Sequence, residues 1–350
     1  MRWWLVGALA LAGCGGGDEP ETMDSGDEVV DSGDEAAPDS GPPPLPACGT
    51  GSPEARMACV ERARWEADLE TIAGARPPGS AHHEAVRELC ASRLASLGFE
   101  VEHHDYGTGV NVVGARAGTS RPDERVLVSA HYDSTPGCPG ADDDASGVAG
   151  ALEVARVLAE TDHARTLVAA CWDEEERGLI GSEAWAERAA ATDTTLVANF
   201  VFEMIGYADD TPDSQSLPPG FELLFPRQVR RIEARGMRGD FLAVVADERH
   251  SAANAADLEA MGERVGLRIV PLVVSDGLLD SPATGDLRRS DHAPFWARDQ
   301  PGMMLTDTAN FRNPRYHCTG GQDTVASLDP TFATRVVQVT VGAAARALNP

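Results

Sequence analysis

The feature that most limits the fold is a regular alternation of strand-like and helix-like segments from about residue 81 to the end of the chain. Residues 147–158 carry apolar side chains at helical spacing, whereas residues 125–130 and 166–171 are continuous apolar runs typical of buried strands. Other strand-like segments are 99–102, 109–113, 195–202, 241–246, 267–274 and 303–306, and other helix-like segments are 81–97, 182–190 and 330–348. This order predicts a single domain with a three-layer α/β/α fold and a central mixed, mostly parallel sheet.

The first 47 residues predict an export signal followed by a tether. Arg2, a short apolar run and the sequence Leu11-Ala12-Gly13-Cys14 are typical of a bacterial lipoprotein signal, cleaved after residue 13 and lipidated on Cys14. Residues 15–46 contain ten acidic residues and no basic one, so residues 14–47 are expected to form a disordered acidic tether. We therefore expect an exported protein of the bacterial cell envelope, lipid-anchored at the outer membrane or cell surface, whose only membrane contact is the anchor.

Charge and composition exclude several functions. The chain has 56 acidic and 29 basic residues and a net charge of −27, which argues against a nucleic-acid partner because phosphate binding requires a basic surface. There is no lysine, so catalysis by a lysine nucleophile is impossible. No Gly-x-Ser-x-Gly segment is present, so the sequence gives no support for a serine hydrolase.

Seven cysteines are present, and six remain after Cys14 takes the lipid. Cys48 and Cys59 flank a short Gly/Pro loop and are expected to form a disulfide in an oxidising compartment. Cys138 and Cys318 could also pair, because both lie beside residues that are expected at one site. The remaining two, in a helical segment and in a strand, are expected to be buried thiols.

Imidazoles and carboxylates gather where the predicted strands end. His131 and Asp133 follow the strand 125–130, a run of acids occupies 173–176, and Glu203 ends the strand 195–202. The carboxyl ends of strands are where an open α/β sheet binds ligands, and mixed His and carboxylate donors suit zinc. The alternative is a set of solvated or salt-bridged loop residues. Four further acids are expected to be helix caps or surface charges: Asp142, Asp144, Asp173 and Glu174.

Six ordered blocks then resemble one family. The segments HYDS, GADDDASG, EERGLIGS, FEMIG, SDHAPFW and RNPRYH are similar to those of the co-catalytic zinc aminopeptidases, whose relatives include glutamate carboxypeptidase and the glutaminyl cyclases. The agreement extends from about Arg76 to Asp329. The resemblance implies a zinc peptidase domain over residues 48–350, two bound zinc ions and a peptide substrate.

The resemblance also implies the metal ligands. His131 and Glu203 would hold one zinc ion, and Glu176 and His317 would hold the other. Asp143 would bridge the two ions. Two ions placed in this way share a water molecule and lower its pKa.

Three more residues receive roles from the resemblance. Glu175 would be the general base, because it is a carboxylate near the water that binds neither ion. Asp133 would take part in catalysis by orienting the His131 imidazole, and Asp291 would support the site from outside the ligand set. The resemblance further implies a cis peptide bond between Asp143 and Asp144.

The sequence departs from the family at two places. Glu203 stands where many members have aspartate, so its longer side chain could hold the metal differently. The loop after His317 is two residues longer than usual, and a Cys138–Cys318 disulfide would brace it.

An aminopeptidase that removes N-terminal residues from peptides is therefore the predicted function. One alternative is a glutaminyl-cyclase-like enzyme with a single zinc ion, which requires the His131 and Glu203 side to be empty. A second is a catalytically inactive, metal-stabilised surface binding protein. A third is a carboxypeptidase for acidic peptides, which would need an arginine cluster near the site; the candidates are Arg288, Arg289, Arg312 and Arg315.

Overall fold

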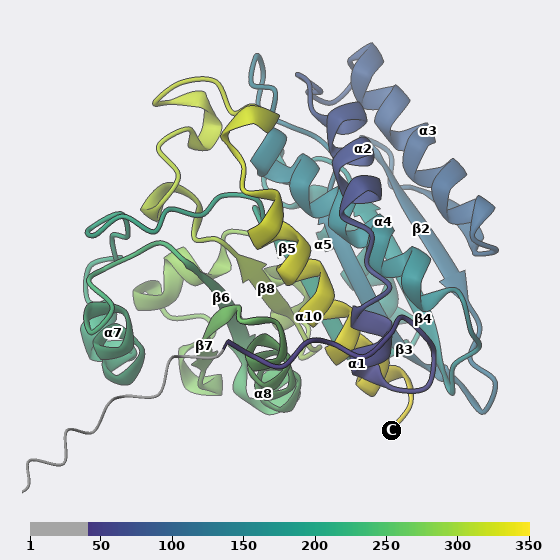
Figure 1. Ribbon diagram of the computed structural model, residues 1–350. Helices are drawn as coiled ribbons and strands as arrows, with labels where there is room; N and C mark the ends of the chain where they lie inside the picture. Colours follow the sequence, from purple (N-terminus) through teal and green to yellow (C-terminus); the bar gives the residue numbers. More distant parts are fainter. Residues whose placement is uncertain (1–40) are drawn as a thin grey trace, which may run out of the picture. The chain divides into compact units, whose positions relative to one another are not determined.

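A computed structural model describes residues 41–350. The expected signal peptide, Cys14 and most of the expected tether lie outside the described residues. Residues 41–350 form one compact unit, drawn in colour in Figure 1. None of the helices in this part of the chain combines the length and the apolar character that crossing a bilayer requires.

An eight-stranded sheet with the order β1-β2-β4-β3-β5-β8-β6-β7 forms the centre of the molecule. Four of its seven neighbouring pairs are parallel: β4 with β3, β3 with β5, β5 with β8, and β6 with β7. The strands are β1 Glu100–Asp105, β2 Val110–Arg116, β3 Arg121–His131, β4 Arg165–Trp172, β5 Thr195–Glu203, β6 Phe241–Asp247, β7 Arg268–Val274 and β8 Met303–Thr306. The predicted mixed, mostly parallel sheet is confirmed.

Helices cover the sheet and complete the three layers (Figure 1). The α-helices are α1 Pro53–Met57, α2 Arg62–Ile72, α3 Ala81–Ser96, α4 Gly147–Leu158, α5 Ile180–Ala191, α6 Phe221–Leu224, α7 Pro226–Glu233, α8 Glu248–Val265, α9 Ala293–Trp296 and α10 Pro330–Leu348. Helix α10 packs against α4 and α8 across one face of the sheet. Short helical turns that matter below are η1 Ala141–Ser146, η2 Glu175–Arg177 and η6 Tyr316–Cys318.

Alternating side chains of the strands belong to separate apolar clusters. On β3, Val126 and Val128 pack into the cluster that includes the apolar faces of α4 and α10, whereas Leu127 packs with Trp172 and Trp185 in a different cluster. Each of these side chains is almost completely buried. Burial on both faces explains why the central strands are continuous apolar runs in the sequence.

One long helix was not predicted. Helix α8 has 18 residues, but its buried side is formed by small or isolated residues such as Ser251, Ala255 and Leu258. Such a helix gives only a weak apolar period, so the sequence pattern did not reveal it. By contrast, α4 and α10 have the predicted bounds because their apolar positions are dense.

Candidate metal centre

The predicted site residues come together at the carboxyl ends of three adjacent parallel strands. His131 is the last residue of β3, and Glu203 is the last residue of β5. Glu175 and Glu176 lie in η2, directly after β4. Since β4, β3 and β5 are neighbours in the sheet, their ends deliver these side chains to the same edge.

The first group of possible metal ligands consists of His131, Glu175 and Glu203, all buried, with their donor atoms within 4.8 Å of one another. The Nε2 atom of His131 lies 3.8 Å from Oε2 of Glu203. Within residues 41–350, neither His131 ring nitrogen nor Glu203 Oε2 has a hydrogen-bond partner of good geometry. Buried polar atoms without partners are costly, so these atoms fit a bound cation.

The second group consists of Asp143, Glu176 and His317. The His317 Nε2 atom lies 3.2 Å from Glu176 Oε2 and 3.3 Å from Asp143 Oδ2. The other oxygen of the same aspartate, Oδ1, lies 3.2 Å from His131 Nε2. One carboxylate therefore faces both imidazoles, which is the position that a bridging ligand requires. The peptide bond that follows Asp143 is cis, as the resemblance implied.

The charges of the site also favour a cation. Burial raises the pKa of Glu175 and of Glu203 well above the ordinary value. Burial alone would lower the pKa of His317, but Asp143 and Glu176 raise it to about 10. A site with more carboxylates than imidazoles must hold protons or a metal ion, and divalent cations stabilise the ionised carboxylates.

Asp133 holds the turn that carries two of the acids. Its carboxylate accepts hydrogen bonds from the backbone N–H groups of Glu175, at 3.1 Å, and of Glu176, at 3.2 Å. The same carboxylate faces His131 Nδ1 at 3.4 Å. Thr135 N–H donates to Glu176 Oε1, which leaves Oε2 directed at His317. Asp133 thus lies where it can orient His131, and it also fixes the geometry of η2.

Asp291 lies buried beside the first group. Neither of its carboxylate oxygens has a hydrogen-bond partner of good geometry among the described residues, and burial raises its pKa to about 7. Its charge contributes to the raised pKa of Glu175. The supporting role of Asp291 stays a prediction.

The four acids expected to be caps or surface charges are all buried, so none of them is a surface charge, whereas Asp144 does act as a cap at the start of α4. Asp142 accepts hydrogen bonds from Gly206 N–H and from the Asn313 side chain, and Asp144 accepts from Met204 N–H as well as capping Gly147.

The other two of these four acids, Asp173 and Glu174, hold the turn after β4. Asp173 bonds to His83 at 2.7 Å, and Glu174 accepts from Thr108 and Arg177. All four acids hold the loops that carry the site, and this could not be read from charge alone.

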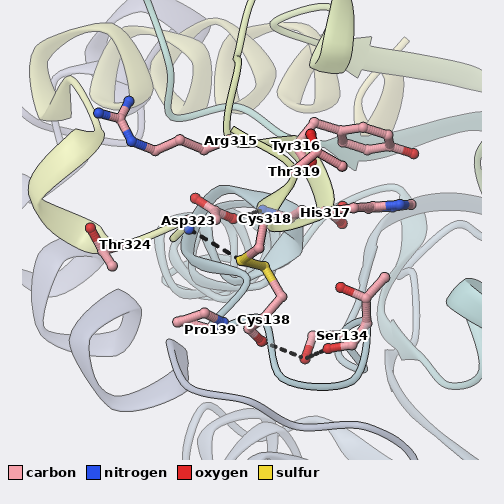
Figure 2. Close-up of a disulfide and its surroundings, with 12 residues drawn as sticks. Ser134, Cys138, Pro139, Arg315, Tyr316, His317, Cys318, Thr319, Asp323 and Thr324 are labelled. Carbon is pink, nitrogen blue, oxygen red and sulfur yellow. Dashed lines mark hydrogen bonds and ion pairs between the residues drawn. A yellow bond between two sulfur atoms is a disulfide. The ribbon is translucent and has the colours of Figure 1, made fainter. Parts of the chain in front are cut away.

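Both expected disulfides are present in the structure. Cys48 pairs with Cys59, and Cys138 pairs with Cys318, 180 residues apart in the sequence. The second bond lies directly beside His317, as Figure 2 shows. Cys90 and Cys171 are buried and free, as expected.

An apolar cavity opens beside Glu203. Its walls come from the segment after β5, from β6 and β7, and from the loops after β7 and β8. The apolar residues that line it are Leu217, Pro218, Phe221, Ile232, Phe241, Ala243, Val245, Val270, Leu272, Leu287, Met304, Ala309 and Phe311. The cavity is therefore suited to an apolar group held next to the metal centre.

The arginine cluster of the carboxypeptidase alternative is not assembled at the site. Of the four candidates, only Arg289 lines the cavity. Arg312 is buried and committed to Gln215 and to backbone carbonyl groups, and Arg288 donates to the carbonyl of Ser281.

Sequence reasoning missed the place of Tyr316. This residue lines the cavity together with Glu203 and Arg289. Tyr316 directly precedes His317 in the block RNPRYH, so its place beside a ligand was a usable signal. The contact between Tyr316 and Arg289 depends on the tertiary fold and had no signal in the sequence.

Residues 111–344 match Peptidase family M28. The chain belongs to peptidase family M28. This match covers more than half of the sequence and confirms, at the level of the family, the predicted class of metal-dependent peptidase.

Two curated proteins are similar in sequence to parts of this chain. The "Uncharacterized protein YfbL" of Escherichia coli is 32% identical over 224 residues, which are 61% of this chain and 64% of that protein. A "Probable zinc metalloprotease" of Pyrenophora teres is 34% identical over 117 residues, 30% of this chain and 25% of that protein. The chain thus spans less than two thirds of the length of either relative.

Solved structures show the same fold. LapA of Legionella pneumophila has a TM-score of 0.64 at 18% identity, covering 84% of this chain and 75% of that chain. An aminopeptidase from Aneurinibacillus has a TM-score of 0.62 at 14% identity, covering 85% and 97%. A glutaminyl cyclase of Porphyromonas gingivalis has a TM-score of 0.56 at 18% identity, covering 81% and 98%. Both predicted enzyme types therefore occur on this fold.

Proposed function

We propose that the protein is an aminopeptidase that removes apolar N-terminal residues from peptides with two zinc ions and Glu175 as general base. The observation that carries the proposal is the pair of adjoining ligand groups that share Asp143, set beside an apolar cavity. His131, Glu203 and the shared aspartate would hold one ion. Glu176, His317 and the shared aspartate would hold the other.

When bound, zinc lowers the pKa of a coordinated water towards about 7 and polarises the scissile carbonyl group. The chain's own residues supply the proton transfers. Within residues 41–350, no hydrogen bond occupies the carboxylate of Glu175, so it is free to accept a proton from water. Its raised pKa suits a base that later returns the proton to the leaving amine.

Two features of the site favour a peptide substrate with a free N-terminus. The surplus of buried carboxylates makes the site attractive to an α-ammonium group. Glu203 lines the apolar cavity, so a side chain of the first residue can enter it while the amine stays near the acids. Burial of such a side chain contributes about 1.5–3 kcal/mol, which would favour leucine or phenylalanine over glycine.

Metal analysis and turnover test the proposal together. The full chain is purified in mild detergent, and bound zinc is counted while aminoacyl-nitroanilides are hydrolysed with and without chelator. We expect two zinc ions per chain, chelator-sensitive release and a preference for apolar residues. One zinc ion without hydrolysis, together with cyclisation of N-terminal glutamine, would support the cyclase-like alternative. Bound metal without any turnover would support the binding protein.

Glu175→Ala distinguishes a base from a ligand. Because the structure also places Glu175 within reach of the first ligand group, its removal could reduce metal content. If Glu175 is the base, the variant keeps both ions and loses about 10²–10⁴-fold in kcat. Glu183→Ala, which removes an exposed glutamate paired with Arg298, is the matched control and should be fully active.

We also propose that the protein is exported and lipid-anchored in the bacterial cell envelope through Cys14. The support is the signal pattern around this cysteine and the acidic segment that follows it. Incorporation of labelled palmitate that disappears in Cys14→Ser tests the anchor. Labelling of the variant at the level of the wild-type protein would contradict it.

A further inference from the structure

A histidine begins the buried face of helix α3. The buried positions of this helix recur at helical spacing and are His83, Val86, Cys90, Ala91 and Leu94. The His83 side chain belongs to a residue that is only 4% exposed. A polar ring at the head of an otherwise apolar stripe costs free energy unless it finds hydrogen-bond partners, so the partners of His83 show what it is for.

The contacts of His83 fix its ring and its proton. Nδ1 accepts from the backbone N–H of Gly79 at 3.4 Å, so Nε2 carries the proton and donates to Oδ1 of Asp173 at 2.7 Å. The backbone N–H of His83 donates to the side chain of Ser80, which caps the helix. The imidazole is therefore held from both ends and directed at the turn that follows β4.

Asp173 passes this restraint to the turn that carries Glu175 and Glu176. Its Oδ1 atom also accepts from the N–H of Glu174 at 2.8 Å, and its Oδ2 atom accepts from the N–H of Val110 at 3.0 Å. Glu174 has a φ of +56°, in the left-handed region that residues with a side chain rarely adopt. Such a conformation persists only where surrounding contacts hold it, and the bond to Asp173 is one of these contacts.

His83 also contacts the end of β3. Its ring stacks on the ring of Tyr132, with the centroids 4.7 Å apart and the planes 25° from parallel. Tyr132 is fully buried and stands between His131 and Asp133 in the chain. One imidazole from outside the ligand groups thus touches both of the strand ends that meet at the metal centre.

We propose that His83 is a positioning residue that, through Asp173, holds the η2 turn in place against the end of β3. The kinetic part of this inference rests on the proposed peptidase function. Within residues 41–350, His83 makes no hydrogen bond to Glu175 or to a predicted ligand, so it acts on the reaction only through the placement of the turn. Placement matters because a displacement of about 1 Å that originates far from the chemistry can cost about 10²-fold in rate.

Two variants of the full-length protein separate the hydrogen bond from the ring. His83→Phe keeps a ring on Tyr132 but removes the donor to Asp173, and at saturating zinc it should lower kcat by about 10-fold with little change in KM. His83→Gln loses the ring but keeps an N–H that can reach Asp173, so it should recover most of that loss. In the Asp173→Asn background, His83→Phe should have little further effect.

Two controls separate positioning from stability. Leu94→Ala removes a fully buried side chain from the same face of α3, so it should lower the midpoint of thermal unfolding at least as much as His83→Phe does and leave kcat unchanged. His82→Gln changes the adjacent histidine, whose Nε2 atom contacts the carbonyl oxygen of Ile72 at 2.9 Å. This variant should also keep the wild-type kcat.

Hydrogen exchange provides a readout that does not depend on turnover. By mass spectrometry, the N–H groups of residues 174–179 should exchange faster in His83→Phe than in the wild-type protein, whereas Leu94→Ala should not change them. Zinc, measured by competition with a chromophoric chelator, should bind about 10-fold more weakly in His83→Phe, because the turn carries the predicted ligand Glu176. Asp173→Asn leaves the imidazole in place and should by itself give the same changes, so the test stands if His83→Phe does not fold.

Three results would overturn the inference. A wild-type kcat in folded His83→Phe would show that the imidazole does not position the turn. Equal losses from His83→Gln and His83→Phe would assign the effect to packing of the ring. An undiminished loss from His83→Phe in the Asp173→Asn background would show that His83 does not act through Asp173. If the wild-type protein hydrolyses no peptide, it is the proposed function that fails, and hydrogen exchange and zinc affinity still decide the role of His83.

Discussion

The Cys138–Cys318 disulfide allows a prediction that separates metal affinity from overall stability. Cys318 directly follows the predicted ligand His317, and Cys138 lies in the loop between the strand end that carries His131 and the turn that carries Asp143. The bond therefore ties together loops that carry ligands of both groups (Figure 2). We expect the double variant C138A/C318A to bind zinc more weakly.

The expected loss of stability follows from the sequence separation of the two cysteines, and the expected loss of zinc affinity follows from the contacts that still hold the loop. The bond joins residues 180 apart, and a chain-entropy treatment of such a loop gives a contribution of about 5 kcal/mol to the free energy of unfolding. The Asp323 carboxylate still holds the loop in the variant, because it accepts hydrogen bonds from the N–H groups of Asp142 and Asp143. We therefore expect the ligand to be loosened rather than lost, with a 10–100-fold weaker metal affinity, typical of the removal of a group that orients a ligand.

The other disulfide provides the control. Cys48–Cys59 joins residues 11 apart and should contribute about 3 kcal/mol to stability, but it is not part of the site. Zinc affinity is measured by competition with a chromophoric chelator, and stability by chemical denaturation, for both double variants. C48A/C59A should lose stability and keep its zinc affinity. Zinc affinity within about threefold of wild type in C138A/C318A would contradict this role of the disulfide.

Further predictions concern stability. Asp323→Ala should lower the free energy of unfolding by about 2–4 kcal/mol, measured by denaturant titration, because two buried N–H groups lose their acceptor; a loss below 0.5 kcal/mol would contradict this. Phe200→Ala, at a fully buried position of β5, should cost about 3–5 kcal/mol, whereas Leu223→Ala, at a residue that is 82% exposed, should cost less than about 0.5 kcal/mol in the same assay. Burial lowers the pKa of His292 to about 4, so the unfolded chain binds more protons than the folded chain between about pH 6.5 and 4. Its contribution to stability is therefore complete above pH 6.5 and falls by about 3 kcal/mol on acidification to pH 4, so His292→Gln should show a flatter dependence of unfolding free energy on pH; an unchanged slope would exclude this effect.

The architecture was predictable because the central elements are buried on both sides. The strands and the helices 147–158 and 330–348 are dense in apolar residues, and their pattern leaves few alternatives. The predicted ligands could be placed at one edge because parallel strands of neighbouring βα units end on the same side. Helix α8 escaped prediction since its buried positions include serine, alanine and glycine, which carry little periodic signal.

The roles of the acids could not be derived from their positions in the sequence. Asp142, Asp143 and Asp144 are consecutive and chemically identical, yet the structure gives them different partners. Asp142 accepts from backbone and amide N–H groups, and Asp144 accepts from the N–H groups of Met204 and Gly147. Only Asp143 directs its two oxygens at two imidazoles. The difference arises from backbone direction in η1, which the sequence does not display.

The buried acids of this strongly negative protein therefore fall into two classes that differ in their hydrogen-bond partners. Acids that hold loops, such as Asp133 and Asp323, accept hydrogen bonds from backbone N–H groups. Glu203 Oε2 has no such donor among the described residues and faces an imidazole that also lacks one. Because these unpaired atoms converge with the other donors of the first group, the gap in the hydrogen-bond network supports this position for a metal ion. Glu203→Gln, which keeps the shape but not the charge, should therefore weaken zinc binding far more than Asp323→Asn does.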